Sequence, residues 1–243
     1  MDKRRSHYYL LSLLFLSLFT ATLLSQPRWL FALADRLFPG ALYAVPRSAK
    51  LPKAVALTID DGPSPATADI LAVLDRYGAK ATFFNISGNL PGHESTVQQA
   101  VQSGHELGNH LTADEPSIRL GADVFEADLL AAEAALLFYL PQGATMKWLR
   151  PGMGFYSAQM VEIARRHGYR LVLGSTFPYD THLPSSRFAS EFILRTVRSG
   201  DIVVLHDGEE RGRRTPRTLE IILPELHKRG YQVVTLSELT AAP

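Results

Sequence analysis

The stretch AVALTIDDGPSPATADILAVLDRYGAKATFFNI, residues 54–86, decides the fold class. Its first seven residues form a largely apolar run that is typical of a buried strand, and Gly62 and Pro63 then turn the chain. Residues 66–78 have the apolar spacing of an amphipathic helix that ends on a glycine, and residues 80–86 form a second apolar strand. A strand followed by a helix and another strand predicts a parallel sheet with helices outside it.

The rest of the chain continues this alternation, about seven times in all. Further strands are predicted at residues 105–110, 146–151, 169–175, 201–207 and 231–239, and further helices at residues 95–104, 123–140, 157–168, 190–200 and 216–230. We therefore expect an α/β fold in which the sheet is either open or closed into a barrel. Active sites of such folds lie at the C-terminal ends of the strands, so the polar residues directly after each apolar run are the functional candidates.

Bulk composition narrows the class of protein. The chain has 243 residues, of which 46% are hydrophobic and 20% charged, and this suits one catalytic-sized domain with a short appendage. A net charge of +1 gives no sign of nucleic-acid binding. The sequence contains no cysteine, which excludes disulfides and thiolate metal sites but does not fix the compartment.

The amino terminus predicts attachment to a membrane. Lys3, Arg4 and Arg5 precede an apolar run from Tyr8 to Leu24, near the short end of the roughly 17–25 residues that span a bilayer. A positive flank stays cytoplasmic, which would place the rest of the chain outside. The length of the run and the lack of a clean cleavage site favour an uncleaved signal anchor, a transmembrane helix, over a cleaved signal peptide. A buried helix of the folded domain is a third interpretation.

The predicted organisation therefore has three parts. Residues 1–26 are the signal anchor or signal peptide, residues 27–53 a linker and residues 54–243 the folded domain. The domain is expected to be membrane-anchored and extracytoplasmic, or secreted if the amino terminus is cleaved. The linker is expected to contain a short amphipathic helix suited to a membrane surface, with apolar residues at Trp29, Leu30, Leu33 and Leu37.

Two adjacent carboxylates, Asp60 and Asp61, end the first strand of the domain. Neighbouring strand residues point to opposite faces, but a turn at the strand end can bring both into one pocket. Two like charges at that distance destabilise each other unless a cation or a proton lies between them. A turn-forming role before Gly62 and Pro63 explains one aspartate but not both, so the pair is a candidate for cation binding or proton transfer.

The segment GNHLTADEP, residues 108–116, places His110 and Asp114 four residues apart. If the chain turns helical after Asn109, the two side chains lie on one face and can share an ion. A hydrogen-bonded core histidine and a carboxylate that caps a turn explain the same residues without a metal. Taken alone, the pair favours that second explanation.

Three further strand ends carry polar residues. Arg150, in WLRPGMG, can clamp a carboxylate, and Gly152 and Gly154 let backbone N–H groups approach a substrate oxygen. Asp180 follows the fifth strand, and His206 ends the sixth in VVLHDG. The structural alternatives are a solvated arginine in a Gly-Pro turn and a hydrogen-bonded core histidine.

With these residues in place, the chain resembles the polysaccharide deacetylases with a NodB homology domain, carbohydrate esterase family 4, over residues 51–239. TIDDGPS resembles the first motif of the family, usually T-F-D-D-G-P-S. GHELGNH followed by Asp114 resembles the second motif, RPGMG the third and VVLHD the fifth. The resemblance implies a distorted (β/α)7 barrel, an N-acetylated glycan as substrate and metal-dependent removal of N-acetyl groups.

The resemblance also implies the residues that move protons. Asp60 would be the general base, and Arg150 would orient Asp60 and keep it charged. His206 would be the general acid, and Asp180 would pair with it and favour its protonated form. This division agrees with the chemistry of amide hydrolysis, which needs an activated water molecule and a protonated leaving amine.

The implied metal ligands depart from the family pattern at one position. Asp61 and His110 match the family, but Asp114 stands where the family has a second histidine. The formal charge of a site with a divalent ion then falls from +1 to 0. The resemblance implies zinc, and the added carboxylate makes the harder ions Mn²⁺ and Mg²⁺, and also Co²⁺, more competitive.

Two other motifs also differ from the family. Gly152 and Met153 replace the proline and the aromatic residue of the third motif, and the backbone N–H of Met153 would help to bind the oxyanion. Thr181 follows Asp180 where the family has tryptophan, which changes one wall of the sugar site. The less aromatic groove argues against long chitin chains in particular.

Two other functions stay open at this point. The chain could be a catalytically silent carbohydrate-binding relative that has lost a metal ligand, or an amidohydrolase that acts on a small linear or cyclic amide. A charged loop at residues 207–218 contains Arg211, Arg213 and Arg214. The loop could guide an anionic glycan, but the sequence favours a solvated loop.

Overall fold

The strand β2, Ala54–Gly62, forms from the apolar run at the start of the domain. The computed structural model describes residues 3–46 and 53–241. Every residue of β2 is buried, as expected of a parallel strand that has neighbours on both edges and helices outside. Its main partners are β3, Thr82–Asn85, and β7, Ile202–His206.

The strands form one eight-stranded sheet with the order β1-β6-β5-β4-β3-β2-β7, and β8 lies beside the start of β2. Every strand pair in this sheet is parallel, so the carboxyl ends of the strands meet at one edge. The remaining strands are short: β1 Ala41–Leu42, β4 Glu106–Asn109, β5 Trp148–Leu149, β6 Arg170–Val172 and β8 Gln232–Val234.

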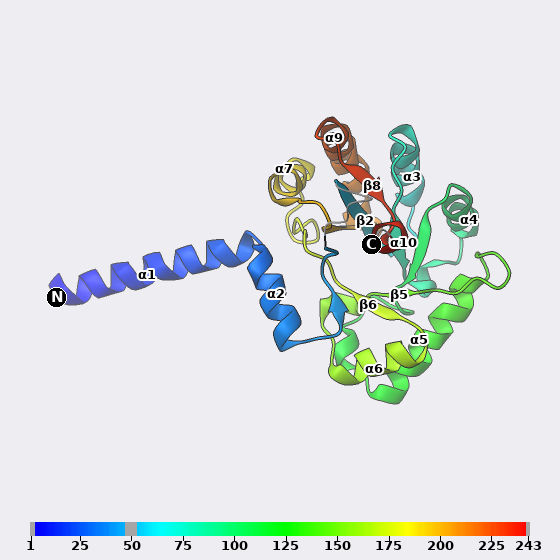
Figure 1. Cartoon of the computed structure of the whole chain (residues 1–243), viewed down its shortest axis with the longest axis horizontal. Helices are drawn as coiled ribbons and strands as arrows, with labels where there is room; N and C mark the ends of the chain where they lie inside the picture. Colours follow the sequence, from blue (N-terminus) through cyan, green and yellow to red (C-terminus); the bar gives the residue numbers. More distant parts are fainter. Residues whose placement is uncertain (1–2, 47–52, 242–243) are drawn as a thin grey trace.

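Helices surround the strands, as Figure 1 shows. The outer helices are α3 Thr67–Arg76, α4 Glu94–Gln102, α5 Ala122–Leu137, α6 Ala158–Arg166, α7 Ser186–Thr196 and α9 Thr215–Lys228. Two short helices, α8 Glu209–Gly212 and α10 Leu236–Ala241, follow β7 and β8. The predicted α/β fold with a parallel sheet is therefore confirmed.

The sheet curls into an incomplete barrel whose two ends meet beyond β6. The N–H of Val204 in β7 donates to the carbonyl of Thr176 at 2.9 Å, and the N–H of Ser175 donates to the carbonyl of Ile202 at 3.0 Å. Thr176 and Val203 form an isolated parallel bridge rather than part of a full strand pair. The barrel is distorted at this seam, in agreement with the expected architecture.

The core has two layers because neighbouring residues of a strand point to opposite faces. Phe83 packs in the large cluster between the strands and the outer helices, whereas Phe84 belongs to a smaller cluster inside the barrel. Leu236 and Leu239 of α10 join this inner cluster and cover the amino end of the strands. The carboxyl end of the barrel is left for polar side chains.

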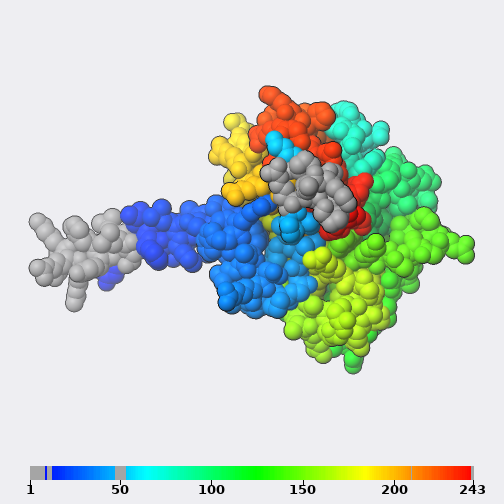
Figure 2. Space-filling model, in the orientation of Figure 1, coloured from blue at the N-terminus to red at the C-terminus, as the bar shows by residue number. Residues whose placement is uncertain are grey.

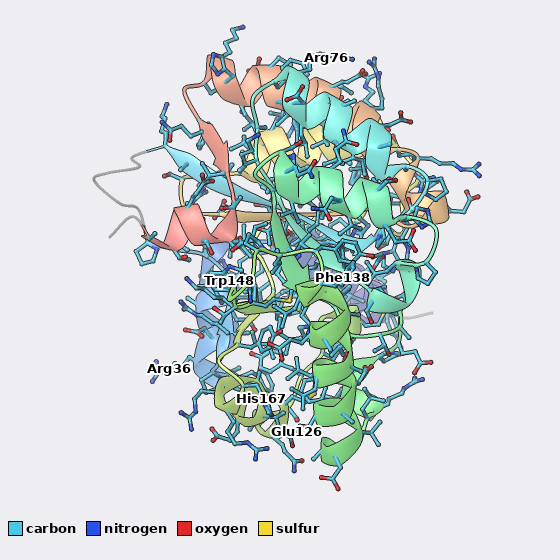
Figure 3. The ribbon with its side chains drawn as sticks, turned by 90° about the vertical axis from the view of Figure 1, so that its right-hand side faces the viewer. Arg36, Arg76, Glu126, Phe138, Trp148 and His167 are labelled. Atoms are coloured by element: carbon cyan, nitrogen blue, oxygen red, sulfur yellow. The ribbon has the colours of Figure 1, made fainter. Side chains whose placement is uncertain are left out.

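A charged cluster connects α5 to α6 on the outside of the barrel, where Figure 3 shows Glu126 and His167 close together. The Nε2 atom of His167 lies 2.5 Å from Glu126, and Arg166 contacts the same carboxylate at 3.3 Å. These side chains are partly exposed, so we attribute to them a modest contribution to stability.

The amino-terminal helices are α1, Lys3–Leu24, and α2, Arg28–Leu37. Figure 2 shows the blue amino-terminal segment projecting from the rounded body of the protein. The side chain of Gln26, between the two helices, makes two hydrogen bonds to the backbone of Phe177, and the hydroxyl of Tyr179 donates to the carbonyl of Leu24 at 2.9 Å. The α1–α2 junction therefore rests on the loop after β6.

Within residues 3–46 and 53–241, none of the helices is long and apolar enough to cross a membrane. The expected transmembrane anchor is thus not confirmed, and the extracytoplasmic location stays a prediction. The amphipathic helix expected in the linker is present as α2. The linker, residues 27–53, also contributes β1, which pairs with β6 and was not expected, and its residues 47–52 lie outside the described part of the chain.

Candidate functional site

The carboxyl end of β2 carries a bulge that brings two adjacent aspartates to the same pocket. Asp60 pairs with Phe84 of β3, but the next partner of β3 is Gly62, so Asp61 is the extra residue. Asp61 adopts a left-handed conformation with φ of 68°, which costs a residue other than glycine about 1–3 kcal/mol. This backbone change removes the usual alternation of side chains. Both carboxylates are buried at 3% and 5% exposure, so partners are required to stabilise their charges.

Asp60 is held by the buried guanidinium of Arg150. The Nη1 atom of Arg150 donates to Oδ1 of Asp60 at 2.5 Å and to the hydroxyl of Thr58 at 2.8 Å. The other nitrogens of Arg150 donate to the carbonyls of Val172 and Leu173, at 3.3 and 2.6 Å. Arg150 therefore ties the ends of β2 and β6 together and presents one fixed charge to Asp60.

His206 lies beside Asp60 at the end of the neighbouring strand, because the register of β2 and β7 pairs these two residues. The Nδ1 atom of His206 donates to Asp180 at 3.0 Å, and the backbone N–H of His206 donates to the same carboxylate. Burial lowers the pKa of His206, but the charge and hydrogen bond of Asp180 and the charges of Asp60 and Asp61 outweigh it and raise the pKa to about 9. The predicted pair of Asp180 and His206 is therefore formed, with His206 in its protonated form near neutral pH.

The raised pKa of His206 makes part of the protein's stability depend on pH. The histidine binds its proton more tightly in the folded state than in the unfolded state, where its pKa is 6.5. This contribution is complete below pH 6.5 and is lost as the pH rises toward about 9, with a total of about 3 kcal/mol. Denaturant unfolding of the wild type and of Asp180→Asn across this range should show a steeper loss for the wild type. If the free energy of unfolding fell equally steeply with pH in both proteins, Asp180 would not be the cause of the raised pKa of His206.

His110 follows β4 and faces Asp61. Its Nδ1 atom lies 2.7 Å from the carbonyl of Arg150, and its Nε2 atom lies 3.4 Å from Oδ1 of Asp61. Burial lowers the pKa of His110, but the hydrogen bond to Asp61 and the charges of Asp60 and Asp61 raise it overall. In the neutral tautomer with the proton on Nδ1, the lone pair of Nε2 points at Asp61. One carboxylate and one oriented imidazole suit a divalent ion.

Asp114 does not join this pair. Leu111 has φ of 65°, and residues 112–115 form bends rather than a helix, so the expected helical face with His110 and Asp114 is not formed. Instead, Nη1 of Arg211 lies 2.6 Å from Oδ2 of Asp61 and 3.3 Å from Oδ2 of Asp114. Among the residues that the structure describes, no group of three or more histidine or acidic residues is arranged to hold a metal ion. The three-ligand assignment therefore stays a prediction, and the structure brings two of its three residues, Asp61 and His110, together.

Arg211 is the functional candidate that the sequence did not single out. It lies on α8, in the charged loop for which a solvated state was favoured. Burial lowers the pKa of Arg211, but its contacts with Asp61 and Asp114 outweigh this and raise it. Burial raises the pKa of Asp61, but the hydrogen bond and charge of His110, the charge of His206 and the hydrogen bond of Arg211 outweigh it and hold the pKa below its usual range. Only the excess of positive charge in the loop could have indicated this contact from the sequence.

The third motif forms a tight turn after β5. Gly152 donates its N–H to the hydroxyl of Ser117 at 2.6 Å, and a Cβ atom at Gly152 would lie only 2.0 Å from the carbonyl oxygen of Glu115. Met153 adopts φ of 59°, and the residue is 61% exposed. The close approach of the Glu115 carbonyl thus explains why residue 152 is a glycine. The N–H of Gly152 is already bonded to Ser117. The oxyanion role of the Met153 N–H stays a prediction.

Asp207 has a structural role that the sequence also did not reveal. It is completely buried and accepts hydrogen bonds from the hydroxyls of Ser64 and Thr67, in the turn that follows β2. Burial raises the pKa of Asp207, while these two hydroxyls act in the opposite direction. The β2–α3 turn is thereby fixed against β7, which positions the two adjacent aspartates.

Two hollows lie on the surface at opposite ends of the strands. One, of about 330 Å³, lies beside α8 and is lined by Pro65, Ala66, Asp69, Arg213 and Pro216. The other, of about 480 Å³, is lined by residues around the starts of β5 and β6, which include Trp148 and His167. Because the second hollow lies at the amino ends of the strands, it is separate from the polar cluster described above.

Comparison with known proteins gives consistent matches. A sequence model of the family described as polysaccharide deacetylase matches residues 47–172. A peptidoglycan-N-acetylglucosamine deacetylase of Bacillus cereus is 34% identical over 200 residues, which cover 81% of this chain and 91% of the relative. A chitooligosaccharide deacetylase of Sinorhizobium fredii is 30% identical over 208 residues, which cover 81% and 96%.

A solved structure shares the fold at lower identity. It is a wild-type CE4 family pseudoenzyme from Bacillus anthracis, with a TM-score of 0.73 and 22% identity, and the match covers 83% of this chain and 69% of that chain. This likeness concerns the fold alone. Activity in such a barrel has to be argued from its side chains.

Proposed function

Because this chain belongs to the polysaccharide deacetylase family, we propose that it removes N-acetyl groups from amino sugars of a peptidoglycan-like or chitin-like glycan. The observation that carries the proposal is the pairing of Asp60 with His206 in register on two neighbouring strands. One of these residues is a carboxylate fixed by Arg150, and the other is an imidazole kept protonated by Asp180. A base and an acid thus lie side by side at the open end of the barrel.

The two residues fit the two proton transfers of amide hydrolysis. A water molecule attacks the acetyl carbon, and Asp60 accepts a proton from that water as the new C–O bond forms. His206 gives a proton to the sugar nitrogen as the C–N bond breaks, so the products are acetate and a free amino sugar. Asp180 holds Nδ1 of His206, which leaves Nε2 to carry the transferred proton.

The family is generally metal-dependent, and this chain retains two suitable donors. A divalent ion bound by Asp61 and His110 would lower the pKa of bound water and polarise the acetyl carbonyl. The carbonyl of Arg150 accepts from Nδ1 of His110 and so holds Nε2 toward Asp61. Arg150 therefore orients both the base and one metal donor from a single strand end.

The expected result with the full chain is acetate release from N-acetylglucosamine oligomers or from peptidoglycan, and loss of that release on treatment with a chelator. The assay compares these glycans with a small N-acetylated amide, which tests the alternative of a small-amide hydrolase. Release from the small amide alone would contradict a glycan substrate. Binding of the oligomers without any release of acetate would identify a silent carbohydrate-binding relative instead.

The silent alternative has one specific observation in its favour. Arg211 contacts Oδ2 of Asp61, so a protein cation already lies on the carboxylate of one proposed donor. The paired base and acid argue against this alternative, because glycan binding alone requires neither a fixed base nor a protonated acid. Their network consists of Arg150, Asp60, Asp180 and His206.

A further inference from the structure

A single cationic nitrogen contacts both of the carboxylates that the family resemblance assigns to a metal. Nη1 of Arg211 is 2.6 Å from Asp61 and 3.3 Å from Asp114. Asp61 lies at the carboxyl end of β2 and Asp114 lies in the loop after β4, so Arg211 bridges the ends of two strands. Oδ1 of the Asp61 carboxylate faces His110 and Oδ2 faces Arg211.

The arginine and a divalent ion act on the same carboxylates. An ion bound by a carboxylate oxygen lies about 2.0–2.2 Å from it, and the guanidinium cannot lose its charge to make room. Two cations around one buried carboxylate repel each other strongly, since the low exposure of Asp61 reduces screening by water. The same guanidinium holds Oδ2 of Asp114 at 3.3 Å.

We propose that Arg211 is an intramolecular competitor of the divalent ion, and that its side chain leaves Asp61 and Asp114 when the ion binds. The proposal rests on the proposed function only in taking Asp61 and His110 as donors. Displacement is feasible because the Arg211 side chain is 34% exposed and that of Asp114 is 44% exposed, so water can solvate the released guanidinium. The four-residue α8 that carries Arg211 is a small element to move.

The test measures ion binding rather than turnover. The full chain is freed of metal and titrated with Zn²⁺ and with Mn²⁺ by calorimetry, in the absence of substrate. Arg211→Met should bind at least one of these ions about tenfold more tightly than the wild type, the factor that corresponds to about 1.4 kcal/mol. Arg211→Gln should show the same direction of change, which guards against a folding defect in one variant.

Arg213→Met is the matched control. Arg213 lies two residues from Arg211, and its variant loses the same charge, but its ion pair among the described residues is with the exposed Glu210, at 3.8 Å, and its side chain is 73% exposed. Its ion affinity should stay close to that of the wild type. If Arg213→Met increased the ion affinity as much as Arg211→Met does, the change would be a general effect of lost positive charge, and the proposal would be wrong. Affinity in Arg211→Met no higher than in the wild type, or no binding at all, would overturn the proposal.

A double-mutant cycle supplies a second readout. If Arg211 withholds Asp114 from the ion, Asp114→Asn should weaken ion binding more in the Arg211→Met background than in the wild type. Equal effects in both backgrounds would show that Arg211 does not withhold Asp114 and would overturn that part of the proposal. Because no arm of the test requires acetate release, failure of the proposed deacetylase activity would be recognised separately.

Discussion

Replacing Arg150 with methionine is expected to lower the free energy of unfolding by about 3–5 kcal/mol, the cost of leaving one partner of a buried ion pair alone. Arg150 and Asp60 are both almost fully buried, and their contact is only 2.5 Å long. The variant would leave the Asp60 charge without a cation and the carbonyls of Val172 and Leu173 without their donors. Methionine fills much of the space, so the loss should be mainly electrostatic.

Chemical denaturation of two further variants separates the buried ion pair from the loss of an arginine in general. Arg165→Met removes an exposed arginine that pairs with Glu162 on the surface of α6, so it should cost far less stability than Arg150→Met. Arg150→Lys keeps the charge but loses the planar fork that serves Asp60, Thr58 and the two carbonyls, so it should fall between the wild type and Arg150→Met. A loss in Arg150→Met as small as that in Arg165→Met would contradict the buried-pair account.

The sequence predicts the layers of this fold well because burial imposes a repeating pattern. The strand and helix that follow Ala54 appear at the predicted positions, and so does the strand that ends in His206. The two residues of β1 carry no such pattern, since a strand that short has no period to detect. The last predicted strand is shorter than expected, because the chain turns into α10 after Thr235.

The site was less predictable because its geometry depends on local backbone conformations and distant contacts. The adjacent aspartates suggested one pocket, but the bulge at Asp61 is set by the register with β3 and cannot be read from spacing. The left-handed Leu111 separates His110 from Asp114, although their spacing suits a helical face. Arg211 meets Asp61 across 150 residues of sequence, and a charge run alone does not identify its partner.

Replacing Asp60 with asparagine is expected to lower acetate release by about 100-fold to 10,000-fold, the usual contribution of a general base. Asparagine has nearly the same shape and keeps a carbonyl oxygen for Arg150, but the buried guanidinium loses its charged partner, so a loss of stability is expected as well. The loss should appear mainly in kcat, because Asp60 acts on the attacking water rather than on the sugar. The comparison is made by acetate release at saturating glycan, with unfolding measured on the same samples.

Two variants show whether Asp60 and Asp61 divide their roles as proposed. Asp61→Asn should lose affinity for the divalent ion, whereas Asp60→Asn should keep it, since only Asp61 faces His110. Asp69→Asn, on the exposed side of α3, removes one carboxylate without touching the site and should leave both properties unchanged. If Asp60→Asn released acetate within tenfold of the wild type, another group would have to be the base. If Asp60→Asn lost ion binding as Asp61→Asn does, both carboxylates would take part in binding the ion. The proposed division into a base and a metal ligand would then be wrong.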